Sequence, residues 1–480
     1  MLEQNEGRAR LSTRRRSGSN ALNLGGLLAV LSLGTSCVAG KDYQRPKVTV
    51  VQSFRGNPGP STATSIAEQS WADVFTDRAL RGLIQTALHD NFDVRIAASR
   101  VLQAEAQYGI TKSYGMPTVD ANASAGAARA RLGGRGEPNT GGLFQLGATV
   151  SWEIDFWGRY KRASEAARAQ ILASQWGQRA VVTSLVSRIA VQYFQLRAYD
   201  HELEIAENSL VSRKESLRLT QVRDTGGAGT LVDVKQAEQL VLGANASIID
   251  LKRLIEQQEN ALSVLTGGAP GPIGRGQELT QQQHVTDVPT GLPSALLERR
   301  PDIQAAEQRL VAANAQVGVA KAQYFPNIHL TASGGVASAS LSTLFSAPAL
   351  VWSAAAGATQ PIFEAGRLDA QLKLTEEQRA EAVLIYRQTI VQAFREVSDA
   401  LVGYQRDREY RTVQEDLVQA ASEARRLADL RYQGGASSYL EVLDSETRLF
   451  TAELALVQAE LNELGQFVEI YRALGGGWHG

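Results

Sequence analysis

The spacing of hydrophobic positions changes several times along the chain, and each period predicts a different element. Between Phe144 and Phe156 apolar and polar residues alternate strictly, which is typical of a long β-strand with one apolar face. A weaker alternation over Thr118–Ala130 predicts a second strand, and the glycine-rich stretch 132–142 between them predicts an exposed loop. The arrangement recurs over Asn327–Ala339 and Leu350–Phe363. We therefore expect one long hairpin of strands from each half of the chain.

The remaining long segments have helical patterns. One helical stretch over 77–114 is interrupted only by Gly82 and Gly109. Two runs of 67 residues, Arg159–Thr225 and Arg367–Gln433, contain no proline and a single glycine each. At 1.5 Å per residue, each run would be about 100 Å long.

Each long run is followed by a glycine pair and a second helical segment, Leu231–Leu265 in one half and Tyr439–Leu474 in the other. Apolar residues in these segments are spaced by three and four, which indicates coiled-coil packing. In the last segment the predicted seam is Leu440, Leu443, Thr447, Phe450, Leu454, Val457, Leu461, Leu464 and Val468. The glycine pairs predict tight helical hairpin tips, and they are Gly226 with Gly227 and Gly434 with Gly435.

The two halves of the chain are copies of one unit. A shift of 208 or 209 positions lays Met116-Pro117 over Phe325-Pro326 and one tip glycine pair over the other. Because glycine and proline fix backbone geometry, their coincidence predicts matching turns. We assign 77–268 to the first repeat and 294–476 to the second. The linker 269–293 has room for one short structured element, and a tail of 477–480 ends the chain.

The N-terminus has the pattern of an export signal. Five arginines precede an apolar run, Ala21–Leu33, that is too short to span a bilayer, and the only cysteine, Cys37, follows. This resembles a lipoprotein signal over 1–36, in which Cys37 is acylated, although Gly34 replaces the usual leucine. Ordinary cleavage near Val38-Ala39-Gly40 is the alternative. Residues 37–76 then form an extended segment.

Charge and motif content exclude several classes of function. The net charge is −1, without the basic stripe of a nucleic-acid binder. The five histidines show no metal-ligand spacing, and no phosphate-binding loop or nucleophile elbow is present. The sequence therefore predicts no enzyme, no cofactor and no metal. An outer-membrane enzyme remains a formal alternative.

The strands have a length suited to a membrane. Thirteen alternating residues can cross a bilayer when tilted, but an open sheet leaves unpaired backbone groups in lipid. Four strands do not close a barrel, so we expect oligomerisation, with three copies giving a twelve-stranded barrel and a long helical tube. A soluble filament or adaptor protein is the alternative reading of the helices.

Several short motifs resemble one known family. Asp42-Tyr43-Gln44-Arg45-Pro46 looks like the start of mature outer-membrane efflux lipoproteins, and Arg299-Arg300-Pro301-Asp302-Ile303, Tyr324-Phe325-Pro326, Pro361-Ile362-Phe363 and Arg431-Tyr432-Gln433-Gly434-Gly435 strengthen the match. Residues 37–476 resemble the outer-membrane factor family, the TolC/OprM-like (NodT-like) channels of tripartite efflux systems. The resemblance implies a homotrimeric outer-membrane channel of a Gram-negative bacterium. Its periplasmic end would meet an adaptor protein and an inner-membrane pump of the RND type.

A channel of this kind needs a closed periplasmic end. Glu441 and Asp444 share one helix face just after the second tip, so a trimer would place six carboxylates around one opening. The family carries acids at matching positions. Asp233 is the equivalent residue in the first repeat, and Tyr432 lies near the second tip. Ordinary solvated acids beside a coiled-coil seam are the alternative.

The resemblance implies further roles near the tips. In the family, polar links between neighbouring helix pairs hold the closed state, but the arginine that often takes part is Ser437 here. The tip glycines are expected to dock the adaptor, or to serve turn geometry alone. The expected cargo is small molecules, with type I protein secretion as the alternative.

Overall fold

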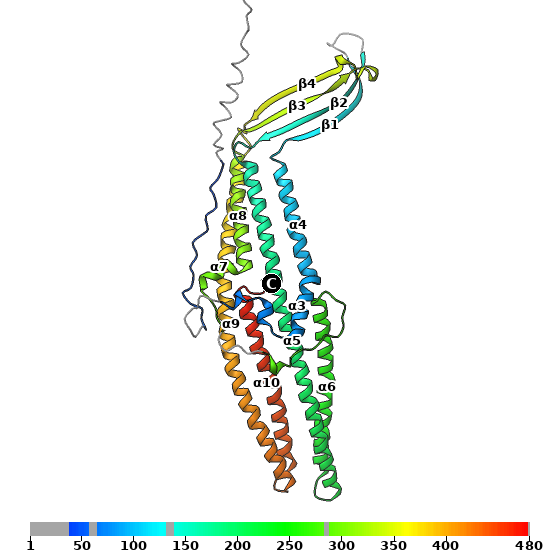
Figure 1. The fold of residues 1–480 in the computed structure, drawn as a ribbon, viewed down its shortest axis with the longest axis vertical. Coiled ribbons are helices and arrows are strands. Elements are labelled where there is room, and N and C mark those ends of the chain that lie inside the picture. Colours follow the sequence, from blue (N-terminus) through cyan, green and yellow to red (C-terminus); the bar gives the residue numbers. More distant parts are fainter. Residues whose placement is uncertain (1–37, 57–64, 131–138, 283–287, 479–480) are drawn as a thin grey trace, which may run out of the picture.

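The computed structural model describes residues 38–56, 65–130, 139–282 and 288–478. The molecule is elongated, with a small sheet at one end and long helices running away from it to two hairpin tips at the other (Figure 1). The expected mostly helical fold with a strand portion is confirmed. The predicted signal segment 1–36 and Cys37 lie outside the described residues.

One antiparallel sheet joins the two halves of the chain. Its order is β1 (Thr118–Ala130), β2 (Asn139–Ile154), β3 (Asn327–Ser338) and β4 (Leu350–Thr359), and β2 pairs with β3 across the repeats. Four strand ends differ from prediction, and two of them are small: β2 ends at Ile154 instead of Phe156, and β3 ends at Ser338 instead of Ala339. β2 begins at Asn139, inside the predicted loop, where it pairs with the end of β1. β4 ends before Pro361, which has no N–H to donate to a ladder.

The register separates an apolar face of the sheet from a polar one. Directly paired residues share a face, and one such row joins Val119, Val150, Ala332 and Ala354. The next row along the strands joins Asp120, Thr149, Ser333 and Ser353, with Ser333 and Ser353 hydroxyls 2.8 Å apart. The sheet therefore has one face suited to lipid and one suited to water.

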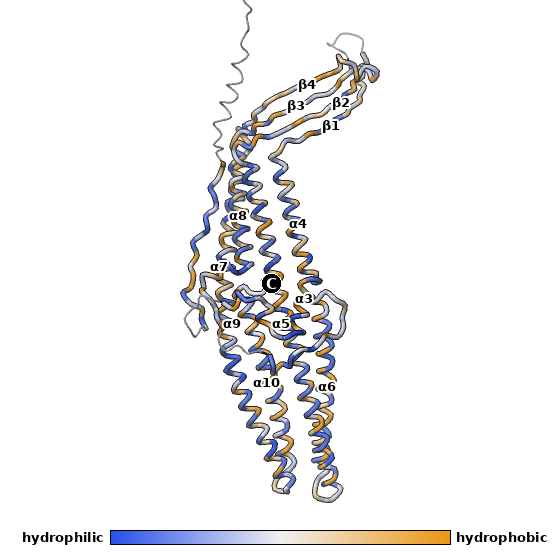
Figure 2. The backbone as a smooth tube through the Cα atoms, viewed as in Figure 1, coloured by the Kyte–Doolittle hydropathy of each residue, from blue (hydrophilic) through white to orange (hydrophobic). Residues whose placement is uncertain are grey.

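The helices confirm the duplication. α4 (Phe92–Ser113) and α8 (Pro301–Ala322) have 22 residues each, α5 (Arg159–Thr225) and α9 (Arg367–Gln433) have 67, and α6 (Leu231–Leu265) and α10 (Tyr439–Ala473) have 35. Hydrophilic residues are interspersed along all of them (Figure 2). In the described part of the chain, no helix combines the length and apolarity needed to cross a membrane.

The prediction of one helical stretch over 77–114 was wrong. The chain forms α3 (Arg78–Asp90) and α4, which meet at Asn91, whereas Gly82 and Gly109 lie inside the helices. The Asn91 side chain caps α4 by accepting from the Asp93 amide at 2.8 Å, and it donates to the Leu265 carbonyl at 2.8 Å. These hydrogen bonds stabilise an extended backbone at Asn91, so the cap and not a glycine ends the helix.

Midway along the molecule, irregular segments wrap the helices and contribute to the main core. They contain the short elements η1 (Ile66–Glu68), α2 (Trp71–Val74), η3 (Leu279–Gln281), η4 (Pro293–Ala295) and α7 (Leu296–Arg299). Two further short helices, η5 (Leu341–Thr343) and η6 (Ala347–Ala349), lie elsewhere, between β3 and β4. Within the expected linker, 269–293, the described residues contain one short element, η3, and η4 begins at its last residue. Tyr193, Tyr386 and Tyr471 are fully buried in this core.

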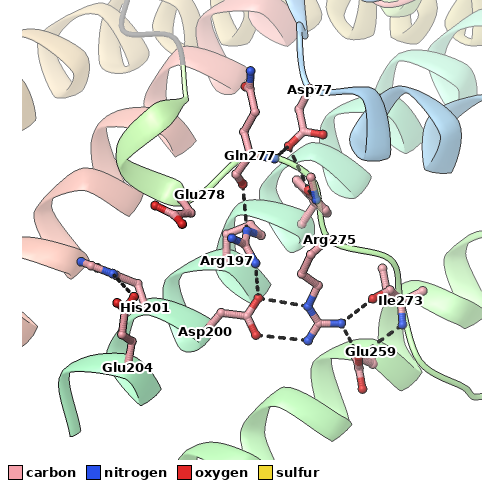
Figure 3. Close-up of polar contacts among 12 residues, drawn as sticks. Asp77, Arg197, Asp200, His201, Glu204, Glu259, Ile273, Arg275, Gln277 and Glu278 are labelled. Carbon is pink, nitrogen blue, oxygen red and sulfur yellow. Dashed lines mark hydrogen bonds and ion pairs between the residues drawn. The ribbon is translucent and has the colours of Figure 1, made fainter. Parts of the chain in front are cut away.

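We call these wrapping segments the belt. Buried polar groups hold the belt to α5 (Figure 3). Asp77, which is 1% exposed, caps α3 through the Ala79 amide at 2.7 Å and accepts from Tyr193 Oη and the Gln277 amide, both at 2.9 Å. Gln282 Nε2 donates to the same carboxylate at 3.1 Å. These hydrogen bonds fix the segment between the repeats against the first repeat.

A second group of contacts in the belt is ionic. Asp200 of α5 pairs with Arg197 at 2.6 Å and with Arg275 at 3.0 Å, and Arg275 also contacts Glu259 of α6. Arg197 Nε donates to the Gln277 carbonyl at 2.9 Å (Figure 3). The belt therefore ties α5, α6 and the inter-repeat segment together.

The coiled-coil seam of α10 differs from the predicted one toward the tip. Val457, Leu461, Leu464 and Val468 are buried as expected. Nearer the tip, Leu440 is 58% exposed and Thr447 is exposed, whereas the neighbouring Tyr439, Val442 and Glu446 are buried. The face of α10 turned inward is thus set by its contacts with both α5 and α9, not by one partner helix.

Candidate gate at the hairpin tips

The two tips have the same backbone geometry. Gly227 and Gly435 have φ angles of +74° and +72°, which L residues with side chains rarely adopt. Gly226 and Gly434 end α5 and α9 with φ of −82° and −74°, which any residue can adopt. The glycine requirement for turn geometry therefore applies to the second member of each pair only.

Glu441 and Asp444 lie in the first turns of α10, beside a groove between α9 and α10 with a volume of about 700 Å³. Both side chains are exposed, and each has an arginine partner. Glu441 is 3.2 Å from Arg431 Nε of α9, and Asp444 is 2.7 Å from Arg448 Nε one turn along α10. The two acids share a face as expected, with their charges partly compensated.

Asp233 has a local role at the start of α6. Its backbone amide donates to Thr230 Oγ1 at 3.2 Å, and its carboxylate accepts from the Thr230 amide at 3.1 Å. This reciprocal pair is a capping box. Asp233 therefore stabilises the first turn of its own helix, whereas its repeat equivalent Glu441 pairs with an arginine.

Tyr432 connects the two hairpins. Its ring is buried and lies 5.5 Å from that of Tyr439, and the Arg223 guanidinium of α5 lies over it at 4.5 Å. Arg223 Nη1 also donates to the Tyr432 carbonyl at 2.7 Å. Burial raises the pKa of Tyr432, with a further contribution from Asp233 and opposition from Arg223. We call Arg223 and Tyr432 the tip clasp.

Neither arginine at the tips was predicted from the sequence as a gate residue, although Arg431 belongs to the tip motif. Arg223 and Arg431 are 208 positions apart, so the repeat shift aligns them three residues before each glycine pair. That coincidence could have identified them. Ser437 is uncharged, and its buried hydroxyl has no hydrogen-bond partner in the described part of the chain. The link between hairpins is instead made from α5 by Arg223.

The first described residues lie at the junction between sheet and helices. The Ala39 amide donates to the Trp157 carbonyl at 2.9 Å, where β2 passes into α5, and Val38 packs against Gly158. Arg162, which is 5% exposed, pairs with Asp42 at 2.7 Å. The residue after Cys37 is therefore held at the base of the sheet.

Aromatic side chains gather at the same junction. Trp157 stacks on Phe325 with ring centroids 4.6 Å apart, and its Nε1 donates to the Pro326 carbonyl at 2.8 Å. Ile362 and Phe363, just beyond β4, are 90% and 87% exposed. A tryptophan beside exposed apolar side chains next to the strands is typical of a membrane–water interface.

No group of three or more metal-ligating side chains that could hold an ion occurs among the described residues. Amphipathic strands for lipid and two long helical hairpins with charged tips together define a subunit of an outer-membrane channel.

Comparison with known proteins agrees with this class. The profile of the family described as "Outer membrane efflux protein" matches residues 83–268 and 292–476. The chain therefore belongs to the outer membrane efflux protein family. It is an outer-membrane efflux channel protein of a Gram-negative bacterium.

Individual relatives are similar over nearly their whole length. The chain is 38% identical over 448 residues to the toluene efflux pump outer membrane protein TtgC of Pseudomonas putida, covering 91% of this chain and 92% of TtgC. It is 35% identical over 447 residues to the cation efflux system protein CusC of Escherichia coli, covering 92% and 96%. The solved OprN outer-membrane channel matches with a TM-score of 0.87 and 30% identity, covering 92% of this chain and 100% of that one.

Proposed function

We propose that three copies of the chain form a passive export duct for small molecules, which works with a periplasmic adaptor and an inner-membrane pump. The observation that carries this proposal is the incomplete wall of the single chain. Strands β1 and β4 are the edges of a four-stranded sheet, and an edge in lipid would leave N–H and C=O groups unpaired. Pairing of β4 with β1 of a neighbouring copy removes both edges.

Exposed apolar residues on the long helices support the same assembly. They are exposed by about half or more, and they include Val211, Leu242, Ile249, Val391 and Val413. Such residues on both hairpins are suited to burial between copies of the chain. The helices would then continue the barrel as a closed tube.

We place the gate of this duct at Glu441, Asp444, Asp233 and Tyr432, with Arg223 added. In a trimer the acids of α10 would surround one opening and attract cations, while the tip clasp would hold each pair of hairpins together. The capping role of Asp233 and the ion pairs of the other two acids are compatible with this arrangement. Because of these ion pairs, neutralising Glu441 or Asp444 would leave Arg431 or Arg448 without this ionic partner.

The tips at Gly226, Gly227, Gly434 and Gly435 are the proposed docking surface for the adaptor. They are exposed and lie at the end of the molecule farthest from the sheet (Figure 1). Gly226 and Gly434 have no need of glycine for their φ angles, so docking offers a reason for them that turn geometry does not.

Acylation of Cys37 fits the position of the next residue, Val38. Val38 contacts Gly158 at the base of the sheet, beside the aromatic residues of the junction. A lipid on Cys37 would therefore reach the inner leaflet of the same membrane. Intact mass measurement of the purified protein tests this, because acylation adds fatty chains whereas cleavage elsewhere leaves an unmodified N-terminus.

We assign the duct no chemistry of its own and place cargo selection with the pump. Relatives with similar sequence identity to this chain are named for very different cargoes, toluene for TtgC and cations for CusC. These names favour small solutes over secreted proteins. Reconstitution in a planar bilayer tests the proposal, since a duct gives discrete ion currents and a non-channel envelope protein gives none.

A further inference from the structure

A row of acidic residues runs along the buried side of α10. Glu446, Glu453 and Glu460 recur every seven residues, and Glu446 and Glu460 are only 6% and 8% exposed. A heptad position buried between helices normally holds an apolar residue. The acids at this position therefore call for a physical reason beyond packing.

Two of these acids line a cavity between the hairpins. It has a volume of about 220 Å³ and lies between α5 and α10, about three helical turns from the tip. Its lining combines Glu446 and Glu453 with Asn208, Ser209 and Ser212 of α5 and Arg425 of α9. A polar cavity of this size has room for several water molecules.

The Glu446 carboxyl is incompletely paired. Its Oε1 accepts from Ser216 Oγ of α5 at 3.3 Å and lies 3.6 Å from Arg425 Nη2. Its Oε2 is buried and makes no hydrogen bond to any described residue. A neutral carboxyl tolerates such a position far better than a carboxylate, which needs hydrogen bonds or water at both oxygens.

Charged groups from three helices face this carboxyl. Arg213 of α5 is buried, donates to the Leu240 carbonyl at 3.2 Å and lies over the Phe450 ring at 4.9 Å. Arg425 of α9 is shared with Ser212 at 2.7 Å and with Asp429 at 3.4 Å. From α10 itself, Tyr439 and Glu453 lie on the same side, and His201 of α5 faces Glu453. Both arginines therefore interact with other groups as well as with Glu446.

We propose that Glu446 is a proton-controlled latch between the two hairpins. When its carboxyl is neutral, α10 packs closely against α5 with Oε2 dry. When it is ionised, the free oxygen draws water into the adjoining cavity and loosens the contact between the hairpins above the gate. Glu453, at the other end of the cavity, acts in the same direction.

Protonation energetics support this direction. Burial raises the pKa of Glu446, and Asp429 adds to the rise, while Arg425, Ser216 and Arg213 oppose it. Burial also raises the pKa of Glu453. The packed state therefore binds the proton more tightly than the separated state. Its extra stability is full below the ordinary glutamate pKa of about 4.3 and is lost as the pH rises through the raised value.

The test measures the separation of the tips and does not depend on ion conduction, so it can fail while the proposed duct stands. Spin labels are attached through Ala228→Cys and Ala436→Cys, which are exposed repeat equivalents in the two tips, in the full chain, whose Cys37 is acylated or removed on processing and offers no free thiol. Their distance distribution is recorded by electron paramagnetic resonance at a series of pH values between 5 and 8. We expect a narrow distribution at pH 5 and a broader, longer one at pH 8.

Two substitutions define the role of the carboxyl. Glu446→Gln is expected to keep the narrow distribution at both pH values, whereas Glu423→Gln, at an exposed acid of α9, is expected to behave like the unsubstituted protein. A distribution that does not change with pH, or that changes equally in Glu446→Gln, would overturn the proposal. Ser216→Ala keeps the acid but removes its hydrogen bond, so the transition midpoint is expected to move to higher pH. An unmoved midpoint would also contradict the latch.

Discussion

Arg223 and Tyr432 join the two helical hairpins at their tips, through a 2.7 Å hydrogen bond to the Tyr432 carbonyl and a guanidinium that lies 4.5 Å from the ring centroid. Because the two residues come from different repeats, their contact opposes separation of α5 from α9. A hydrogen bond from a charged donor contributes about 1.5–3 kcal/mol, and a cation–aromatic contact adds about 0.5–1 kcal/mol.

We therefore expect Arg223→Ala to weaken closure of the tips. A loss of about 1.4 kcal/mol raises the open fraction of a mostly closed channel tenfold, so single-channel recordings are expected to show more frequent or larger openings. Arg218→Ala is the matched control, because Arg218 lies on the same helix but is exposed and, within the described part of the chain, pairs with Glu215 of its own turn. Equal currents from both variants would argue against the tip clasp.

Neutralising the α10 acids is expected to change ion selectivity. Asp444→Asn with Glu441→Gln removes two carboxylates per copy and leaves Arg448 and Arg431 without their partners, so the opening becomes less negative. Conductance is expected to rise and the preference for cations to weaken, as read from the reversal potential in a salt gradient. Glu423→Gln serves as the control, and an unchanged reversal potential would place the acids away from the pore.

The two glycines of each tip are expected to respond differently to alanine. Gly435→Ala places a side chain at φ +72° and should cost about 1 kcal/mol of local stability, although an added Cβ has open space. Gly434→Ala has no such backbone cost. If the tips dock the adaptor, both variants are expected to weaken adaptor binding in a pull-down or in calorimetry. Loss of binding in Gly435→Ala alone would mean that the glycines serve turn geometry only.

Asp77 is expected to be a point of acid sensitivity. Burial alone would raise its pKa, but hydrogen bonds from Gln282, Tyr193 and the backbone outweigh this and lower the pKa below its ordinary value. The stability that the carboxylate contributes is thus present above the ordinary aspartate pKa of about 3.9 and is lost as the pH falls through the lowered value.

Asp77→Ala is expected to reduce the free energy of unfolding by about 3 kcal/mol, because it leaves several buried donors unpaired. Thermal loss of the helical circular dichroism signal in detergent measures this effect. Asp90→Ala, at the exposed C-terminal end of the same helix, should change it little. A similar shift in both variants would mean that the belt does not depend on Asp77.

The sequence predicted the long elements well where a single hydrophobic period, or a single glycine or proline, determines their bounds. Arg159–Thr225 and Leu231–Leu265 match the observed helices because no competing cap interrupts them before the glycines. The break at Asn91 combines a local cap, which accepts from the Asp93 amide, with a hydrogen bond to the Leu265 carbonyl, and the second partner is remote in sequence.

The inward face of α10 was missed for a related reason. Leu440 belongs to as good an apolar series as Tyr439, and the packing of α5 and α9 together buries Tyr439 and leaves Leu440 exposed, while Leu443 is half-buried. The acids of the proposed gate were selected from their spacing after the tip. Their arginine partners depend on side chains that meet across a hairpin, which spacing along one helix does not reveal.

The central claim is that one chain supplies only part of a pore wall. The most direct measurement is the mass of the purified protein in detergent, by native mass spectrometry or light scattering, followed by bilayer recording of the same sample. The account predicts three copies per particle and discrete cation-preferring currents. A monomer that stays in solution without detergent and conducts no ions would contradict it.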